Sequence, residues 1–418
     1  MNTENYVNQI VKHAKTASRS IASASTTTKN TALHSISEGI LSSASVLKAE
    51  NEKDILAAQK AGLSAAMIDR LRLTDSRIHG MAEGVRQIIQ LADPVGELLG
   101  GHTRPNGLQI QKVRVPLGVI AIIYESRPNV TADAASLCLK AGNAVILRGG
   151  KESIHSNIAI YKILTSALEK AGLDPRCIQL VEVTGREAID FLLKADQYVD
   201  VVIPRGGEAL IRTVVEKSTI PVIKHYKGVC HTYVDEFANI TMAGEICCNA
   251  KVQRPATCNA METMLVHEKI ASVFLPYVAK KLHDAGVEIR GCNKTCSMLD
   301  TIQPVSEDDY YHEYLDLILN VRVVATIDDA IAHITKYGSS HSDAIVTDHV
   351  NHALKFTKEV DSAAVYVNAS TRFTDGYEFG LGAEIGISTD KLHARGPMGL
   401  EELTTYKFVV LGNGQLRK

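Results

Sequence analysis

The 418-residue sequence lacks a long hydrophobic run and lacks an excess of charge of either sign. Its longest nearly unbroken apolar stretch, from Val115 to Tyr124, is far shorter than the roughly 20 residues that a membrane helix needs. The 45 Lys and Arg residues and the 47 Asp and Glu residues give a net charge of -2, which offers no general attraction to a nucleic-acid backbone. The sequence therefore argues against membrane and nucleic-acid partners. Its polar N-terminus lacks a signal-peptide pattern and predicts a cytoplasmic location.

The sequence also lacks paired cysteines and the common nucleotide-binding motifs. Its eight cysteines form neither CxxC pairs nor a regular framework, which argues against structural zinc and against a disulfide scaffold. Cys292 and Cys296 have no further His or Cys pair at ligand spacing, so no metal is expected. The patterns GxGxxG and GxxxxGK[ST] are missing, which excludes the usual Rossmann pyrophosphate grip and a kinase-type P-loop.

The length predicts two or three domains, and the apolar patterns divide the chain. Helical spacing runs over residues 4–93, and residues 107–115 alternate apolar and polar side chains as in a ribbon with one exposed face. From 119 to about 235 strands and helices are expected to alternate, ending with a strand at 221–226, and a second α/β unit covers about 240–389. This alternation predicts an α/β protein with a doubly wound parallel sheet. Such a sheet binds ligands, by default a nucleotide, at the carboxyl ends of its strands.

Cys258 is the first candidate for chemistry. It lies in a Pro-containing loop between a predicted helix and a predicted strand, four residues after Arg254, whose positive charge favours a thiolate nearby. A single cysteine is more often a packed structural residue, and only the loop position and the polar neighbours of Cys258 favour a chemical role, so the pattern alone leaves both interpretations open.

Asn129 is the second candidate, at the boundary between an apolar strand and a helix in YESRPNVTADAAS. Its side chain can cap the helix, or its amide can donate a hydrogen bond to a negative charge that develops on a carbonyl substrate. A third candidate is the turn AVILRGGKES, in which Arg148 and Lys151 flank two glycines after a predicted strand. Two cations there suit the 2'-phosphate of NADP, although they are also consistent with a solvated basic turn.

Taken together, these segments resemble the aldehyde dehydrogenase superfamily over nearly the whole chain. The resemblance is carried by VPLGVIAIIYESRPNVTADAASLCLKAGNAVILRGGKES, VIPRGGEALI, KVQRPATCNAMETMLVH, EYLDLIL, SDAIVT, VNASTRF and GAEIGISTDKLHARGPMGLEELTTYKFVV. Within the superfamily the chain is most similar to enzymes that reduce acyl phosphates. The implied fold class is α/β and aldehyde dehydrogenase-like, with a Rossmann-like cofactor domain, an α/β catalytic domain and a small β oligomerisation part.

The resemblance also implies roles for individual residues. Cys258 matches the catalytic nucleophile, and Asn129 matches the oxyanion-hole asparagine, with the backbone N–H of Cys258 as the second donor. PRGGE lies where the superfamily has its nicotinamide-side turn, and Glu313 lies where relatives hold the nicotinamide ribose. The cofactor-binding residues implied in this way are Arg148, Lys151, Pro204, Gly206, Gly207, Glu208 and Glu313.

The sequence departs from the superfamily pattern at two positions. Lys151 stands where NAD-preferring relatives have a glutamate for the adenine ribose, and an ammonium there attracts a 2'-phosphate, which favours NADPH. In VIKHYKGVCH the general-base glutamate is replaced by a residue such as His225 or Tyr226. A thioester that must wait for a hydride benefits from this loss, because no base then activates water.

The implied reaction is the NADPH-dependent reduction of L-glutamyl 5-phosphate to L-glutamate 5-semialdehyde with release of phosphate, through a Cys258 thioester. This is the second step of proline biosynthesis from glutamate. The substrate's charges require two cations and an acid. Arg372 is the candidate for the carboxylate, Asp375 for the ammonium, and Arg127 or Arg254 for the leaving phosphate, although each also fits a surface ion pair.

The implied domain boundaries are 1–235 for the NADP-binding domain, 236–385 for the catalytic domain and 386–418 for a C-terminal return. A ribbon at 104–120 interrupts the first domain. Its pairing with the C-terminal strand across subunits would protect both exposed edges and predicts a homodimer or higher homo-oligomer. The labile substrate makes association with the upstream glutamate 5-kinase a further hypothesis. Two alternatives stay open: an NAD(P)-dependent enzyme for another acyl donor or a free aldehyde, and a non-catalytic protein that kept the fold.

Overall fold

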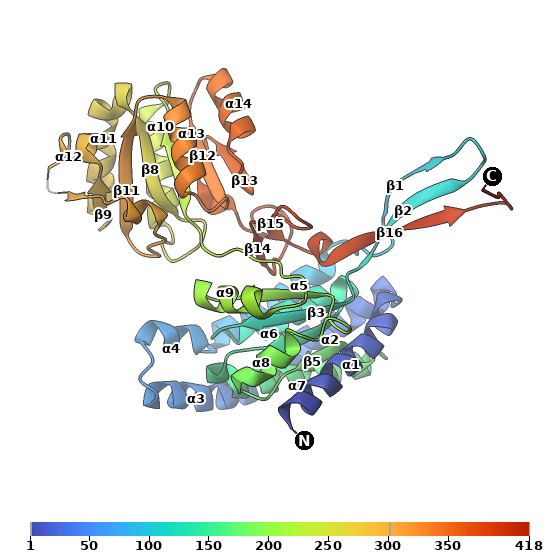
Figure 1. Ribbon diagram of the computed structural model, residues 1–418. Coiled ribbons are helices and arrows are strands. Elements are labelled where there is room, and N and C mark those ends of the chain that lie inside the picture. The colour runs from blue at the N-terminus through green and yellow to red at the C-terminus, as the bar shows by residue number, and fades with distance from the viewer. Residues whose placement is uncertain (1, 301, 418) are drawn as a thin grey trace. The chain divides into compact units, whose positions relative to one another are not determined.

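The computed structural model describes residues 2–300 and 302–417 and divides into two units (Figure 1). The first unit contains the chain up to Lys224, Gly380–Gly386 and the segment from Met398 onward. The second unit contains His225–Phe379 and Ile387–Pro397. The chain is thus divided after Lys224, whereas the sequence pattern places the division at 235.

Helices form the N-terminal part of the first unit, as the spacing over 4–93 predicts. Three of them begin at Ser25, Ser64 and Thr74, whose side chains accept the backbone N–H three positions on. The buried stripe of the first helix contains Val7, Val11 and Ala14, which pack on the sheet described next. The helices are α1 (Thr3–Ala22), α2 (Thr26–Ser42), α3 (Ala44–Lys60), α4 (Ala65–Leu71) and α5 (Asp75–Gln90).

A parallel sheet in the order β5-β4-β3-β6 forms the centre of the first unit. Its middle strand has the sequence VIAIIY and is buried along its whole length, as expected for a parallel strand covered on both faces. The predicted alternation of strands and helices is therefore confirmed here. The strands are β3 (Val119–Tyr124), β4 (Ala144–Arg148), β5 (Ile178–Leu180) and β6 (Val201–Arg205), and the helices are α6 (Asn129–Lys140), α7 (Ile154–Lys170), α8 (Arg186–Leu192) and α9 (Glu208–Lys217).

The strand predicted at residues 221–226 is wrong. Only Val222 pairs with the sheet, through an isolated parallel bridge to Val202. The next strand along the chain is β7 (Cys230–Val234), which belongs to the sheet of the second unit. The segment therefore connects the two units, and its apolar residues do not extend into a ladder.

A three-stranded antiparallel ribbon completes the first unit, in the order β1-β2-β16 (Figure 1). Its strands are β1 (Leu98–Thr103), β2 (Gln109–Pro116) and β16 (Thr404–Leu411). The sequence predicts that the 107–115 segment pairs with the C-terminal strand across subunits, and this is wrong, because β2 pairs with β16 of the same chain and with β1 on its other side. The outer strand β16 leaves Tyr406, Phe408 and Val410 largely exposed at alternate positions, which places these side chains on one face of the ribbon.

The second unit is built on a parallel sheet in the order β10-β9-β11-β8-β7-β12-β13. Its strands are β7, β8 (Met261–His267), β9 (Glu288–Gly291), β10 (Gln303–Pro304), β11 (Ile318–Val324), β12 (Ser342–Val346) and β13 (Ala364–Val367). Its helices are α10 (Ile240–Val252), α11 (Glu268–Asp284), α12 (Asn293–Cys296), α13 (Ile327–Tyr337) and α14 (Val350–Glu359). A short pair, β14 (Gly386–Ser388) and β15 (Gly396–Met398), lies where the chain passes between the units.

Apolar side chains cover the second sheet in two clusters. One includes Phe274, Leu275 and Val278 of α11, and the other includes Ile334 of α13 and Phe356 of α14. The predicted second α/β unit is therefore confirmed, with β7 as an additional strand between β8 and β12. No helix among the described residues is both long and apolar enough to cross a membrane.

Candidate active site

Cys258 lies in the loop that joins α10 to β8, and its side chain is half-buried. A fully buried ion pair joins the two ends of this loop: Lys251 Nζ lies 2.7 Å from Glu262 Oε2. Burial raises the pKa of Glu262 to about 7 and lowers that of Lys251, so desolvation outweighs their mutual attraction. The candidate nucleophile therefore lies on a loop whose two ends are joined by an ion pair that is buried from solvent.

Two residues that the sequence analysis did not single out pack against the backbone of Cys258. The thiol of Cys230 at the start of β7 donates to the Cys258 carbonyl oxygen over 3.2 Å. A β-carbon built on Gly228 would lie 1.7 Å from the same oxygen, so only glycine fits there. The N–H of Gly228 donates to Glu313 Oε1 over 2.9 Å, which connects the predicted ribose-binding glutamate to the nucleophile loop.

Three further candidates of the second unit gather around this loop. Arg372 interacts electrostatically with Arg254, Cys258 and Asp375, and its pKa is lowered, chiefly by burial and next by Arg254. The carboxylate of Asp375 accepts the backbone N–H of Tyr377 over 2.9 Å. Arg254 is exposed. The structure thus brings together the thiol, two cations and one carboxylate that the sequence singled out in separate segments.

His225 occupies the segment in which the superfamily has its general-base glutamate. Its Nδ1 lies 2.9 Å from the carbonyl oxygen of Ile387, which can only accept a hydrogen bond, so Nδ1 carries the proton. The ring also meets the edge of His341 at 5.8 Å between centroids. Tyr226 beside it is half-buried. Of the two residues that the resemblance offers for this position, His225 is therefore an anchored imidazole.

In the first unit, Asn129 is the exposed first residue of α6. Its Nδ2 donates to Asp133 Oδ2 one turn further on over 2.9 Å, and Pro128 occupies the N-cap position. The N-cap interpretation of Asn129 is therefore wrong, because its side chain caps no helix. Burial raises the pKa of Asp133 to about 6.

The loop before Asn129 is strained and braced. Ser126 has a positive φ of 23°, which is uncommon for a residue with a side chain. Both its N–H and its hydroxyl donate to Glu152 Oε1. Arg127, the next residue, is exposed. No local motif marks Glu152, yet its two hydrogen bonds to Ser126 hold the loop where the chain enters α6.

The two cations of the RGGK turn have different surroundings. Arg148 is buried, and its guanidinium donates to the carbonyl oxygens of Gly149 over 2.7 Å and Thr184 over 3.0 Å. Lys151, in contrast, is exposed at the first position after the turn. A β-carbon on Gly149 would lie 2.2 Å from Asn157, so this glycine is required by packing. Of the two cations, Lys151 is therefore the one that a ligand in solvent can reach.

The PRGGE turn joins β6 to α9 in the same unit. Pro204 is buried in β6, whereas Gly206 and Gly207 are exposed directly before the helix. Glu208 pairs with Arg212 on the helix, over 2.8 Å from Nε. Glu125, which the sequence analysis missed, accepts the N–H of Gly207 over 2.9 Å and braces the turn.

These features of the first unit fit a phosphate-bearing dinucleotide. Helix N-termini that follow parallel strands offer unsatisfied N–H groups to phosphates. Strands β4 and β6 are the two neighbours of β3, so Lys151 and the Gly206–Gly207 turn follow strands on either side of the same central strand. Among the described residues, no group of three or more His, Cys, Asp or Glu side chains could hold a metal ion.

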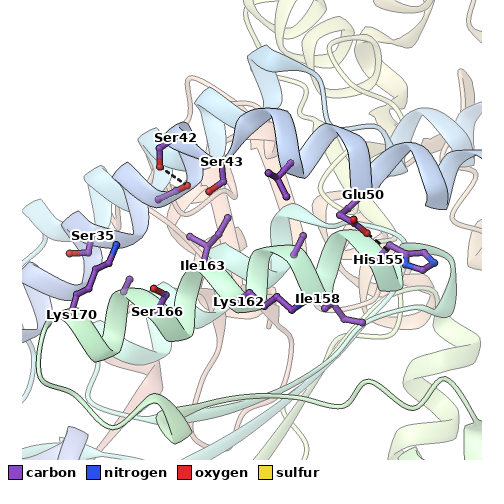
Figure 2. Close-up of a pocket in the computed structure, with 14 residues that line it drawn as sticks. Ser35, Ser42, Ser43, Glu50, His155, Ile158, Lys162, Ile163, Ser166 and Lys170 are labelled. Carbon is purple, nitrogen blue, oxygen red and sulfur yellow. Dashed lines mark hydrogen bonds and ion pairs between the residues drawn. The ribbon is translucent and has the colours of Figure 1, made fainter.

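A separate groove of about 440 Å³ lies between α7 and the helices α2 and α3 (Figure 2). Lys170 and Ser35 lie at one end of it, and Glu50 and His155, 4.0 Å apart, lie at the other. None of the residues predicted to take part in catalysis lines this groove.

Comparison with known proteins identifies the class. The model of the aldehyde dehydrogenase family matches residues 1–289, so the chain belongs to the aldehyde dehydrogenase family. Among its relatives, the gamma-glutamyl phosphate reductase of Thermodesulfovibrio yellowstonii is 58% identical over 407 residues, 97% of each chain. The enzyme of the same name from Carboxydothermus hydrogenoformans is 59% identical over 408 residues, 98% of each chain.

A solved structure agrees with these relatives. The crystal structure of gamma-glutamyl phosphate reductase from Thermotoga maritima matches with a TM-score of 0.97 and 46% identity, over 99% of this chain and 100% of that one. The resemblance read from the sequence and the predicted fold class are therefore confirmed.

Proposed function

We propose that this protein reduces L-glutamyl 5-phosphate to L-glutamate 5-semialdehyde with NADPH and releases phosphate, as the second step of proline biosynthesis from glutamate. The proposal is supported by the sequence similarity to gamma-glutamyl phosphate reductases, which extends over nearly the whole chain. It is also supported by the position of Cys258 near Arg254 and Arg372. The protein is an oxidoreductase that acts on an acyl phosphate.

Cys258 is the nucleophile in this proposal. Its thiolate attacks the acyl carbon of the substrate and forms a carbon–sulfur bond, and the bond from that carbon to the phosphate oxygen then breaks. Phosphate leaves with the electron pair, and a thioester remains on Cys258. After reduction the hemithioacetal oxygen re-forms its double bond, the carbon–sulfur bond breaks, and the thiolate of Cys258 is regenerated.

Two hydrogen-bond donors stabilise the negative oxygen in this scheme. They are the side-chain amide of Asn129 and the backbone N–H of Cys258, and removal of such a donor typically lowers kcat by about 10²–10³. The bond from Asn129 to Asp133 orients the amide. The support for Cys258 comes from Cys230 and Gly228, which hold the peptide unit that follows it.

The residue at the position of the general base supports a reductase. The Nδ1–H of His225 donates to the carbonyl of Ile387, which anchors an imidazole in this segment. A thioester on Cys258 is thereby spared the carboxylate that promotes hydrolysis in oxidising relatives.

The cofactor in the proposal is NADPH, which supplies a hydride to the thioester when bound. The residues that would hold it are Lys151 for the 2'-phosphate, the turn of Pro204, Gly206, Gly207 and Glu208 at the start of α9, and Glu313 for the nicotinamide ribose. Arg148 would contribute indirectly, because its guanidinium braces the carbonyls of Gly149 and Thr184 in the same turn.

The substrate's charged groups have counterparts around Cys258. Arg372 is proposed to bind the α-carboxylate, Asp375 the α-ammonium, and Arg254 or Arg127 the phosphate. The electrostatic contact of Arg372 with Asp375 and Cys258 supports the first two of these roles.

The ribbon supports a homo-oligomer. Strand β16 is an edge strand of the β1-β2-β16 ribbon and exposes Tyr406, Phe408 and Val410, which a second copy of this chain would cover. Association with glutamate 5-kinase and a cytoplasmic location belong to the proposal as well. Size measurement of the purified protein, with Phe408→Lys as the variant, tests the oligomer: a monomeric wild type would contradict it.

The reaction is best tested in reverse, because the acyl phosphate is unstable. Purified wild type and Cys258→Ala are assayed for NADP reduction with glutamate 5-semialdehyde, with and without phosphate. Phosphate-dependent activity that is lost in the variant is expected. Activity without phosphate would indicate oxidation of a free aldehyde, and an inactive wild type would favour another substrate or a non-catalytic protein.

A further inference from the structure

Asn259, the residue directly after the nucleophile, contacts several residues of the segment 371–374. The side chain is only 4% exposed. Its Nδ2 donates to the carbonyl oxygens of Thr374 over 2.9 Å and Arg372 over 3.3 Å, and its Oδ1 accepts from Thr257 over 3.0 Å and from Arg372 Nη1. The carbonyl of Asn259 accepts the hydroxyl of Thr371 over 2.7 Å. The loop of Cys258 and the segment of Arg372 are thus fastened by one side chain.

The guanidinium of Arg372 is held at a second point by the other end of the same loop. Its Nε donates to Oε1 of Gln253 over 2.9 Å. Gln253 follows α10 directly and Asn259 precedes β8, so the two acceptors flank Cys258 along the chain. An arginine side chain has many rotamers, and fixing two of its nitrogens selects one of them.

The chemical nature of the two acceptors is informative. Both are neutral amide oxygens, which orient a guanidinium and leave its positive charge available to another group. A carboxylate at either position would form an ion pair with Arg372 and occupy it. The two hydrogen-bond acceptors therefore orient Arg372 without forming an ion pair with it, beside the half-buried Cys258, and Asp375 is the carboxylate that acts on its charge from the same segment.

We infer that Asn259 and Gln253 are positioning residues. They fix the distance between Arg372, which binds the substrate's α-carboxylate, and the nucleophile Cys258. This inference rests on the proposed function, in which Arg372 binds that carboxylate. Because one loop carries both the nucleophile and the two acceptors, any shift of Cys258 moves the carboxylate-binding group with it. The enzyme would thereby select acyl groups with a carboxylate at a fixed distance from the reacting carbon.

The test uses Gln253→Glu, because Gln253 is exposed and the variant keeps its shape. The KM for glutamate 5-semialdehyde is expected to rise about tenfold or more, with kcat changed less than about threefold, since an ion pair with Arg372 removes ground-state binding of the carboxylate. The kcat/KM for butanal, which has no carboxylate, is expected to stay unchanged. Gln197→Glu adds the same charge on an exposed residue of the first unit and is the matched control.

A double-mutant cycle with Arg372→Ala shows whether Gln253 acts through the arginine. In that background Gln253→Glu is expected to have no further effect on KM. The rate of Cys258 alkylation by iodoacetamide is expected to match the wild type in Gln253→Glu, which shows that the loop is intact. Slower alkylation with an unchanged KM would overturn the inference, since Gln253 would then only support the loop.

The two hypotheses fail in different ways. An unchanged KM in Arg372→Ala would remove Arg372 from the substrate site and contradict the proposed function on this point. A raised KM in Arg372→Ala together with a wild-type KM in Gln253→Glu and in Asn259→Asp would leave the function intact and overturn the inference. Asn259 is buried, so Asn259→Asp is used only if its unfolding temperature equals that of the wild type. If it does not, the result for Gln253→Glu alone decides the test.

Discussion

A β-carbon on Gly228 would lie 1.7 Å from the carbonyl oxygen of Cys258. The α-carbon of this glycine therefore packs directly against the backbone of Cys258. The same residue donates its N–H to Glu313, so one glycine contacts both the candidate nucleophile and a candidate cofactor ligand. A methyl group at this position has no room unless the loop of Cys258 moves.

The Gly228→Ala variant is expected to fold and to lose activity. Displacement of the Cys258 backbone would misplace a proposed oxyanion donor, so kcat should fall by about 100-fold or more. Steady-state kinetics in the reverse direction measures this. Gly80→Ala is the control, because a β-carbon on Gly80 of α5 meets nothing within 4 Å. A wild-type kcat in Gly228→Ala would contradict this prediction, because the loop of Cys258 could then move without loss of activity.

The buried pair of Lys251 and Glu262 predicts a stability effect. Lys251→Met leaves a buried carboxylate without its partner and is expected to cost about 3–5 kcal/mol. The double variant Lys251→Met, Glu262→Leu removes both charges and should recover most of that loss. Thermal and urea unfolding of the three proteins give the comparison. Equal losses in the single and the double variant would contradict this account of the pair.

Two buried histidines predict loss of stability in mild acid. Burial lowers the pKa of His333 to about 2 and that of His341 to about 3. The unfolded chain binds a proton at each ring below about pH 6.5, whereas the folded chain does not, so stability decreases as the pH falls through 6.5. Each ring contributes about 1.4 kcal/mol per pH unit over this window.

His333→Phe separates this contribution from that of other groups. Between pH 6.5 and 5.0 the wild type should lose about 2 kcal/mol more than the variant. Urea unfolding at several pH values, with fluorescence or circular dichroism as the signal, provides the measurement. If the wild type and the variant lose the same stability over this range, His333 is protonated in the folded protein.

Lys151 predicts the preference between the two nicotinamide cofactors. Lys151→Glu places a carboxylate where a 2'-phosphate is proposed to bind, so the KM for NADP should rise about tenfold or more while the KM for NAD stays the same or falls. Lys170→Glu makes the same change of charge at the C-terminal end of α7 and should alter neither value. A KM for NADP that is unchanged in Lys151→Glu would place the phosphate elsewhere.

Much of this protein follows from local sequence. The apolar run VIAIIY and its neighbours predict parallel strands that are buried on both faces, and the period of α1 predicts its buried stripe. The segments around Cys258 and elsewhere resemble the aldehyde dehydrogenase family closely enough to indicate the family, and the same resemblance makes Cys258 the candidate nucleophile. These features are local, because periodicity and short motifs depend on residues that are close along the chain.

Only the tertiary structure decided which residues support the site. Asn259 and Arg372 are 113 positions apart, and Gly228 and Cys258 are 30 apart, so no local pattern marks their contacts. The segment 221–226 looks like a strand, yet the chain there leaves one sheet for the other. Arg148 and Lys151 look equivalent in sequence. In the structure Arg148 is buried and donates to backbone carbonyls, whereas Lys151 is exposed. Contacts between distant segments depend on how the sheets and loops pack, which the order of residues alone does not reveal.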